Sequence, residues 1–159
     1  MKKSFPAYAL TGALLLAGAV ASLRADTPAA NAAAREVATI VNTSATVQAI
    51  NDAPFAARGS ITKDVIARVD TAKDLLAKLD ERATAADAGV RTAFAKARSE
   101  VLARESAVRD SAMKAKNTDA EPAWEAARDT LAHDYEAYGA AATNAEATLL
   151  PPVETTASK

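Results

Sequence analysis

The chain has 159 residues, of which 50% are hydrophobic but only 4% aromatic, and it contains no cysteine. This length allows one small domain, and without cysteine we expect neither disulfide cross-links nor a cysteine-linked lipid anchor. The formal net charge of −1, with so few aromatic residues, disfavours nucleic acid as a partner. The chain is alanine-rich, and because alanine favours helix but buries little surface, we expect a helical protein with a thin core.

The first 25 residues have the three parts of a secretory signal peptide. Lys2 and Lys3 supply the positive start, an apolar run covers residues 7–20, and small residues follow. The apolar run is too short to cross a bilayer as a stable helix, which distinguishes it from a membrane anchor. We therefore expect a signal helix that is cleaved near Ala21 or Ala25, and a mature protein that is periplasmic or secreted.

Residues 26–59 form an N-terminal segment that we expect to be partly helical and partly flexible. Between Glu36 and Asn51 the apolar residues fit one face of a helix, yet alternating β-branched residues also fit a strand. We favour helix because no other part of the chain offers a strand partner, and a lone strand is not stable. A break is expected at Pro54, and Ser60 is the expected N-cap of the next helix.

The clearest helical pattern covers residues 60–87 and 89–116. In the first range apolar residues recur at alternating spacings of four and three, which is a heptad stripe: Val65, Val69, Ala72, Leu76, Leu79, Ala83 and Ala86. The second range has a stripe of its own: Phe94, Ala97, Val101, Val108, Ala112 and Ala115. Arg104 and Glu105 interrupt this second stripe. A turn near Gly89 separates the two ranges, although the first stripe continues in phase beyond it, so one unbroken helix is the alternative.

A third helix is predicted over residues 119–149. Thr118 and Glu121 have the spacing of a capping box, and Pro122 falls in the first turn, where its missing N–H costs nothing. The apolar stripe of this helix again has spacings of three and four: Trp124, Ala127, Leu131, Tyr135, Tyr138, Ala142, Ala145 and Leu149. A Pro-Pro pair ends the helix, and residues 151–159 are expected to form a disordered tail.

These elements predict an all-α fold. Residues 60–150 should form an antiparallel three-helix bundle or coiled coil, and the sequence leaves open whether an additional N-terminal helix joins it. The helix over 89–116 is basic and both neighbours are acidic, which favours antiparallel packing of the three. Each exposed ion pair contributes only a few tenths of a kcal/mol, so charge selects the arrangement without holding it together.

The chain has one histidine, His133, which shares a helical face with Asp129 and Glu136. Carboxylates and an imidazole at such spacings can hold a divalent metal. One imidazole without a second histidine or a cysteine is a weak zinc signal, so we expect a solvated histidine and no metal or other cofactor. The sequence also has no recognisable nucleophile elbow, phosphate loop or metal motif. We therefore assign no catalytic residues and do not expect an enzyme.

Two further features have both a functional and a structural interpretation. Trp124, Tyr135 and Tyr138 could form a platform for a ligand, but their helical spacing favours anchors of the core. The second helix carries a basic run that could meet an anionic lipid or polyanion: Arg91, Lys96, Arg98, Arg104, Arg109, Lys114 and Lys116. Favourable i,i+4 pairs support a solvated, internally paired face instead: Glu100–Arg104, Glu105–Arg109 and Asp110–Lys114.

Three short sequences, together with the long heptad stripe between them, resemble a family of exported proteins: APFAAR at 53–58, AWEAAR at 123–128 and DYEAY at 134–138. The family consists of small Ala-rich coiled-coil proteins of Gram-negative bacteria, loosely grouped with stress-associated proteins. The resemblance covers about residues 53–149. It implies a helical bundle of the cell envelope and provides no catalytic residues to transfer.

The leading functional hypothesis is a periplasmic, non-enzymatic interaction protein that self-associates and is linked to envelope stress or chaperoning. Its partners would be a second copy of the chain or an unknown envelope protein. A binder of membrane surfaces or polyanions is an alternative, which the scarcity of Leu, Phe and Trp on the helix faces disfavours. A metal-binding envelope protein that uses His133 is the other alternative. The sequence does not specify the partner, the oligomeric state or the biological trigger.

Overall fold

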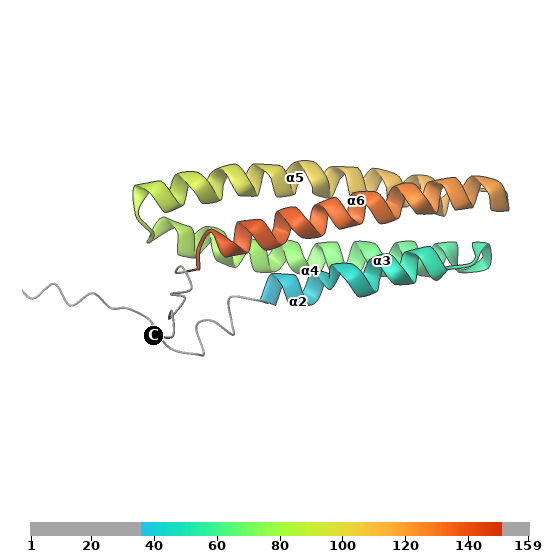
Figure 1. Ribbon diagram of the computed structural model, residues 1–159, viewed down its shortest axis with the longest axis horizontal. Coiled ribbons are helices and arrows are strands. Elements are labelled where there is room, and N and C mark those ends of the chain that lie inside the picture. Colours follow the sequence, from blue (N-terminus) through green and yellow to red (C-terminus); the bar gives the residue numbers. More distant parts are fainter. Residues whose placement is uncertain (1–35, 151–159) are drawn as a thin grey trace, which may run out of the picture.

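The computed structural model describes residues 36–150, which form helices joined by short turns (Figure 1). The elements are α2 (Glu36–Val41), α3 (Thr43–Asp52), the 3₁₀ turn η1 (Phe55–Ala57), α4 (Arg58–Thr84), α5 (Ala88–Lys116) and α6 (Glu121–Ala147). This part of the chain contains no strand, so the all-α prediction is confirmed. The signal peptide predicted over residues 1–25 and the tail predicted over 151–159 lie outside the described residues.

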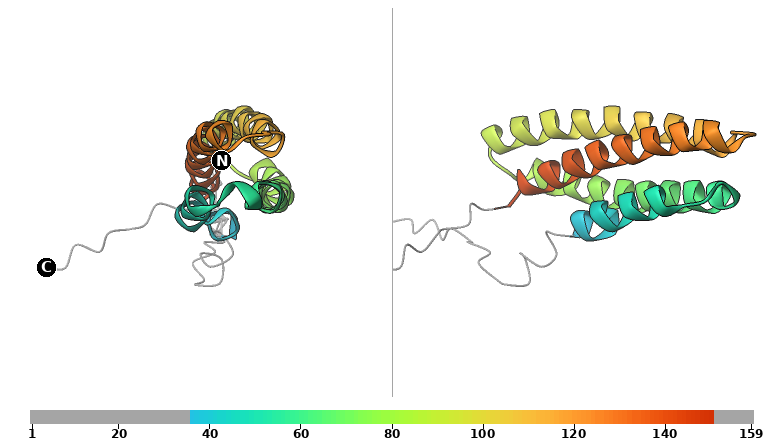
Figure 2. Two further views of the ribbon diagram at one scale, coloured as in Figure 1. Left: turned by 90° about the vertical axis from the view of Figure 1, so that its right-hand side faces the viewer. Right: turned by 45° about the vertical axis from the view of Figure 1, so that its right-hand side comes forward.

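Four rods make up the bundle. The helices α4, α5 and α6 alternate in direction, and α2 and α3 together form another rod beside α4 and α6 (Figures 1 and 2). Within the N-terminal segment, Glu36–Val41 and Thr43–Asp52 are therefore helical, as favoured over a strand, and they complete the bundle. Residues 26–35 lie outside the described residues. The end-on view of Figure 2 shows α2 and α3 on the side of the bundle opposite to α5.

The predicted apolar stripes form one core. In α4 the stripe from Val65 to Ala83 is buried, and in α5 the residues predicted from Phe94 to Ala115 are buried as well. The largest fully buried side chains belong to α6: Trp124, Tyr135 and Tyr138. These aromatic side chains are anchors of the core, because each of them is no more than 1% exposed.

The chain turns between α4 and α5 just before Gly89. Asp87 is the N-cap of α5, and its carboxylate accepts a hydrogen bond from the N–H of Val90 at 2.9 Å. The alternative of one unbroken helix is therefore wrong. Because the turn resets the helical phase, Ala93, which would continue the stripe of α4, is exposed.

Two predicted helix caps are also wrong. The N-cap of α4 is Ala57, because η1 runs directly into the helix, and the hydroxyl of Ser60 donates to the Ala57 carbonyl at 2.9 Å. The N-cap of α6 is Ala120, which offers no side-chain cap. The Thr118 hydroxyl donates instead to the Ala115 carbonyl at 2.8 Å, because the end of α5 leaves carbonyls without partners inside the helix.

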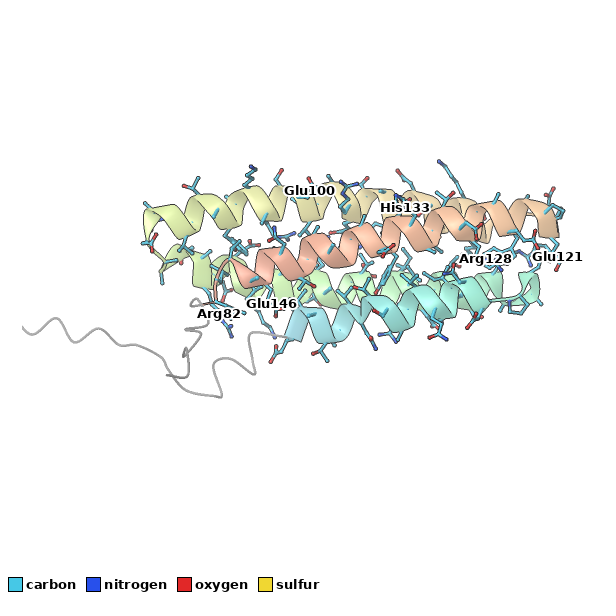
Figure 3. All side chains as sticks on the ribbon, viewed as in Figure 1. Arg82, Glu100, Glu121, Arg128, His133 and Glu146 are labelled. Atoms are coloured by element: carbon cyan, nitrogen blue, oxygen red, sulfur yellow. The ribbon has the colours of Figure 1, made fainter. Side chains whose placement is uncertain are left out.

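Polar side chains of α6 hold α2 and α3, which we call the N-terminal rod. The buried carboxylate of Glu146 accepts hydrogen bonds from the backbone N–H groups of Val37 and Ala38, at 3.1 and 3.2 Å. Figure 3 shows Glu146 beside the start of α2. The first turn of a helix has N–H groups without partners inside the helix. Glu146 therefore caps α2 from a helix that is distant in sequence.

The break between α2 and α3 also depends on α6. Asn42 adopts a φ of 40°, in the left-handed region that asparagine tolerates better than most residues. The hydroxyls of Tyr135 and Thr46 both donate to the carbonyl of Val41, at 2.7 and 3.2 Å. Burial raises the pKa of the Tyr135 phenol, so it stays protonated and remains a donor. The carbonyl next to the break is thus satisfied by side chains.

We expect Glu146→Gln to loosen α2 while the bundle stays folded. Glutamine keeps the size of the side chain but offers one acceptor oxygen, so an amide donor then faces one of the two backbone N–H groups. Amide hydrogen exchange at Val37 and Ala38 should become about tenfold faster, which corresponds to a loss of about 1.4 kcal/mol. The exposed Glu136→Gln is the control. Equal exchange in both variants would contradict the cap.

Candidate interaction face between α4 and α5

The candidate functional site is the outer face that α4 and α5 form together. Leu102 and Met113 are 51% and 62% exposed, and they are the large hydrophobic side chains that residues 36–150 expose. They lie eleven residues apart in α5, which places them on one side of the helix, about three turns from each other. Each lines a groove between α5 and α4. We call this surface the α4–α5 face.

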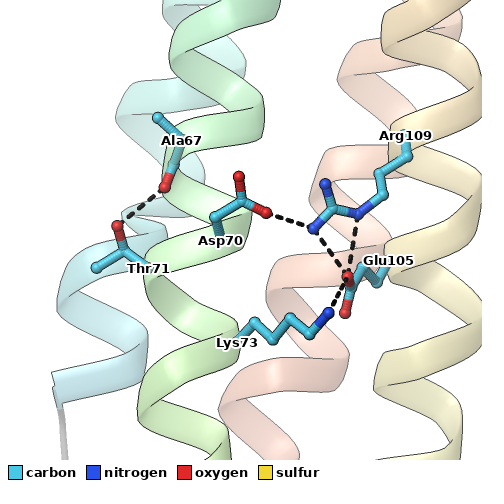
Figure 4. A network of polar contacts seen from close by, with 6 residues as sticks. All are labelled: Ala67, Asp70, Thr71, Lys73, Glu105 and Arg109. Atoms are coloured by element: carbon cyan, nitrogen blue, oxygen red, sulfur yellow. Dashed lines mark hydrogen bonds and ion pairs between the residues drawn. The ribbon is translucent and has the colours of Figure 1, made fainter.

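Charged side chains join the two helices in the middle of this face (Figure 4). Arg109 of α5 donates to Asp70 of α4 at 2.5 Å and to Glu105, one turn earlier in α5, at 2.9 Å. The Nζ atom of Lys73 in α4 lies 3.9 Å from the same Glu105 carboxylate. The hydrogen bond to Asp70 raises the pKa of Arg109 above its usual value. These contacts link α4 to α5, and because Asp70 and Lys73 are exposed, their ion pairs add little stability.

Glu105 is the buried member of the network, although it lies where the apolar stripe of α5 was expected to be interrupted. It is 7% exposed, and its Oε2 atom lacks a hydrogen-bond partner within the described chain, as does the hydroxyl of Tyr138. Burial raises the pKa of the Tyr138 phenol, and the Glu105 carboxylate raises it further. At Glu105 the apolar stripe of α5 is therefore interrupted by a buried polar side chain and not by a solvent-exposed one.

One groove lies where the start of α4 faces the end of α5, and we call it the Gly59 groove. Its volume is about 460 Å³, and Gly59, Ile66, Ala112 and Met113 contribute to its lining. A Cβ atom added at Gly59 would meet no atom within 4 Å, so the space above this residue is open. Three cationic side chains and no carboxylate complete the charged part of the lining: Lys63, Arg109 and Lys116.

A second groove lies nearer the turn between α4 and α5. Its volume is about 440 Å³, and Phe94 and Leu102 contribute apolar surface to it. Its charged lining has both signs, and Arg98 and Asp80 pair across it at 3.4 Å. The two grooves therefore differ in charge, although both expose apolar side chains of α5.

The candidate metal ligands lie on a different surface. His133, Asp129 and Glu136 are all exposed on α6, and Figure 3 shows His133 on the outside of the bundle. Asp129 pairs with Arg128 at 3.4 Å. Within residues 36–150 no group of three or more His, Cys, Asp or Glu could hold a metal ion. The exposure of His133 agrees with the interpretation as a solvated histidine.

The basic run of α5 is only partly paired. Arg104 binds Glu100 at 2.7 Å, and Arg109 binds Glu105, as the i,i+4 spacing predicted. In the described part of the chain the third predicted pair, with Lys114, does not form, and the ion pairs that leave α5 reach α4 and not α6. The expected pairing of α5 with its acidic neighbour α6 is therefore not observed. Their contact is made by packed side chains.

Comparisons of the chain with protein-family models, with curated proteins and with solved structures find no match. The resemblance to exported Ala-rich coiled-coil proteins therefore stays a prediction. Among the described helices, none is long and apolar enough to span a membrane.

Sequence analysis did not identify the α4–α5 face, although one signal was present. Leu102 and Met113 are large apolar residues of α5 that fall outside its predicted stripe. Their spacing of eleven residues places them on a second side of the helix. An apolar pair outside the core stripe is thus the sequence feature that points to this surface.

Proposed function

We propose that the protein is a non-enzymatic interaction protein of the cell envelope that self-associates through the α4–α5 face. The placement of Leu102 and Met113 carries this proposal, because the two side chains stand exposed on one side of α5 beside apolar grooves. Exposed apolar side chains that line grooves, with charged residues between them, form the surface through which a partner could bind. The envelope location rests on the signal-peptide pattern of residues 1–25, and a link to stress or chaperoning rests on the family resemblance.

A symmetric dimer could bury the exposed apolar side chains of this face. If two α5 helices pack antiparallel about a twofold axis midway between the two side chains, Leu102 of each copy meets Met113 of the other. Both exposed apolar side chains are then covered in one contact. The chain has no cysteine, so cysteines introduced at these two positions would report this register without interference.

We expect the double variant Leu102→Ser/Met113→Ser to weaken self-association by about tenfold or more, since it removes both apolar Leu102–Met113 contacts of the dimer. Sedimentation velocity over a range of protein concentrations measures the effect. The helical content should stay unchanged, because both side chains lie outside the core. The control is Thr130→Ser/His133→Ser, two exposed positions of α6. A wild-type protein that stays monomeric throughout, or equal association of both variants, would contradict the proposal.

Two alternatives have less support. A membrane-surface binder would use the cations of α5, and co-sedimentation with anionic liposomes at low salt tests this directly. A metal-binding role would use His133, which stands exposed on α6 apart from any group of three potential ligands in the described residues. Zinc titration of the wild type and His133→Ala would distinguish that role, since identical isotherms would exclude it.

A further inference from the structure

The Gly59 groove has an apolar wall that is in contact with water when no ligand is bound. Ile66 of α4 is half-buried, Ala112 of α5 is buried, and Met113 stands 62% exposed beside them. The methionine side chain is flexible and polarizable, so it adapts to ligands of irregular shape. This wall would favour an alkyl chain over a polar ligand.

The charged part of the groove has one sign. Lys63 and Lys116 make no ion pair within residues 36–150, whereas Arg109 is already bound by Asp70 and Glu105. Gly59 belongs to the first turn of α4, where Ala57 provides no side-chain cap. Two free ammonium groups beside a hollow without carboxylates complement an anion.

The size of the groove suits a small ligand. Its volume of about 460 Å³ lies within the range of about 300–1,000 Å³ that is common for small-molecule sites. A polar anion alone would leave the apolar wall in contact with water, and a neutral hydrocarbon would leave the two ammonium groups unused. A molecule with an alkyl chain and one anionic head satisfies both parts of the site.

We propose that the Gly59 groove binds a free fatty acid, as a monomer in solution. The alkyl chain lies along Ile66, Ala112 and Met113, and the carboxylate lies between Lys63 and Lys116. The site is complete within one copy of the chain. The proposal therefore goes beyond self-association, and because the proposed dimer contact would cover Met113, it is tested on the monomer.

Isothermal titration calorimetry with dodecanoate, kept below its critical micelle concentration, tests this site at a protein concentration at which the chain is monomeric. We expect saturable binding of one dodecanoate per chain. Lys63→Gln/Lys116→Gln should weaken binding about tenfold or more, since it removes both unpaired charges. Gly59→Leu should abolish binding by filling the groove, and it should stay folded because the space is open and leucine favours helix more than glycine does.

Matched controls distinguish binding in the Gly59 groove from nonspecific attraction between the ligand and the protein. Lys78→Gln/Lys96→Gln removes two exposed cations outside the groove and should leave dodecanoate binding unchanged. Dodecyltrimethylammonium, with the same chain and a cationic head, should not bind in the groove. No dodecanoate binding, equal losses in the two lysine pairs, equal binding of the cationic amphiphile, or binding only to anionic vesicles would each overturn the proposal. Sedimentation of the same variants reports self-association separately.

Discussion

Trp124→Ala is expected to lower the free energy of unfolding by about 3–5 kcal/mol. Trp124 is 1% exposed and is the largest side chain buried in the described core. Many of the other buried side chains are alanines, which cannot extend into the space that the indole leaves. The total stability of a small domain is about 5–15 kcal/mol, so this single truncation should bring the bundle close to unfolding.

The indole also makes a hydrogen bond, which a second variant removes with less loss of packing. Its Nε1 donates to the carbonyl of Ala53 at 3.2 Å and so links the start of α6 to the turn after α3. Trp124→Phe keeps much of the buried apolar area but leaves this carbonyl without its donor. We expect Trp124→Phe to cost about 1–3 kcal/mol, and the difference from Trp124→Ala then reports packing alone.

Urea unfolding followed by far-ultraviolet circular dichroism measures these losses without relying on tryptophan fluorescence. The control is Leu102→Ala, which truncates a side chain that is 51% exposed and should change stability by no more than about 0.5 kcal/mol. If Trp124→Ala and Leu102→Ala unfolded at the same urea concentration, the indole would not be an anchor of the core.

The helices and their buried faces could largely be predicted because local spacing determines them. The stripe of α4 from Val65 to Leu79 is buried as expected, since residues three and four apart share one side of any helix. Helix ends were predicted less well. Ser60 and Thr118 have the side chains of good caps, yet each donates to a carbonyl of the preceding turn. Ser60 already lies inside α4, and Thr118 directly follows the C-cap of α5.

The N-terminal rod shows why some local structure cannot be predicted from local sequence. Residues 36–51 fit a helix and a strand almost equally, and what favours the helix lies about a hundred residues away. Glu146 supplies the acceptor at the start of α2, and Tyr135 supplies a donor at the break beside Asn42. Neither partner lies within residues 36–51, so the spacing of residues in that segment cannot reveal them.

The grooves of the candidate site lie between helices, which limits prediction from sequence further. The Gly59 groove needs Lys63 of α4 opposite Lys116 of α5, and only the packed alignment of the two helices brings them together. Charge patterns indicated that α5 would pair with both neighbours. The structure directs its ion pairs to α4, which leaves the cations at the end of α5 free to meet a ligand.

Gly139→Ala is expected to destabilise the protein by about 1–3 kcal/mol, although alanine normally stabilises a helix relative to glycine by about 0.5–1 kcal/mol. A Cβ atom at Gly139 would lie 2.0 Å from the Oγ1 atom of Thr43 and 2.9 Å from its Cβ atom. Threonine is branched at Cβ and cannot move aside by rotating one bond. Relief would require α3 and α6 to separate, and that would weaken the contact that holds the N-terminal rod.

Two comparisons make this prediction specific. Gly59→Ala makes the same chemical change where a Cβ atom meets nothing within 4 Å, so its stability in urea unfolding should be equal to or higher than that of the wild type. In the double variant Gly139→Ala/Thr43→Gly the clash is removed, so it should be more stable than Gly139→Ala despite the additional helical glycine. A Gly139→Ala protein as stable as Gly59→Ala would show that α3 and α6 do not pack this closely. In that case the N-terminal rod would be a loosely attached element rather than part of the core.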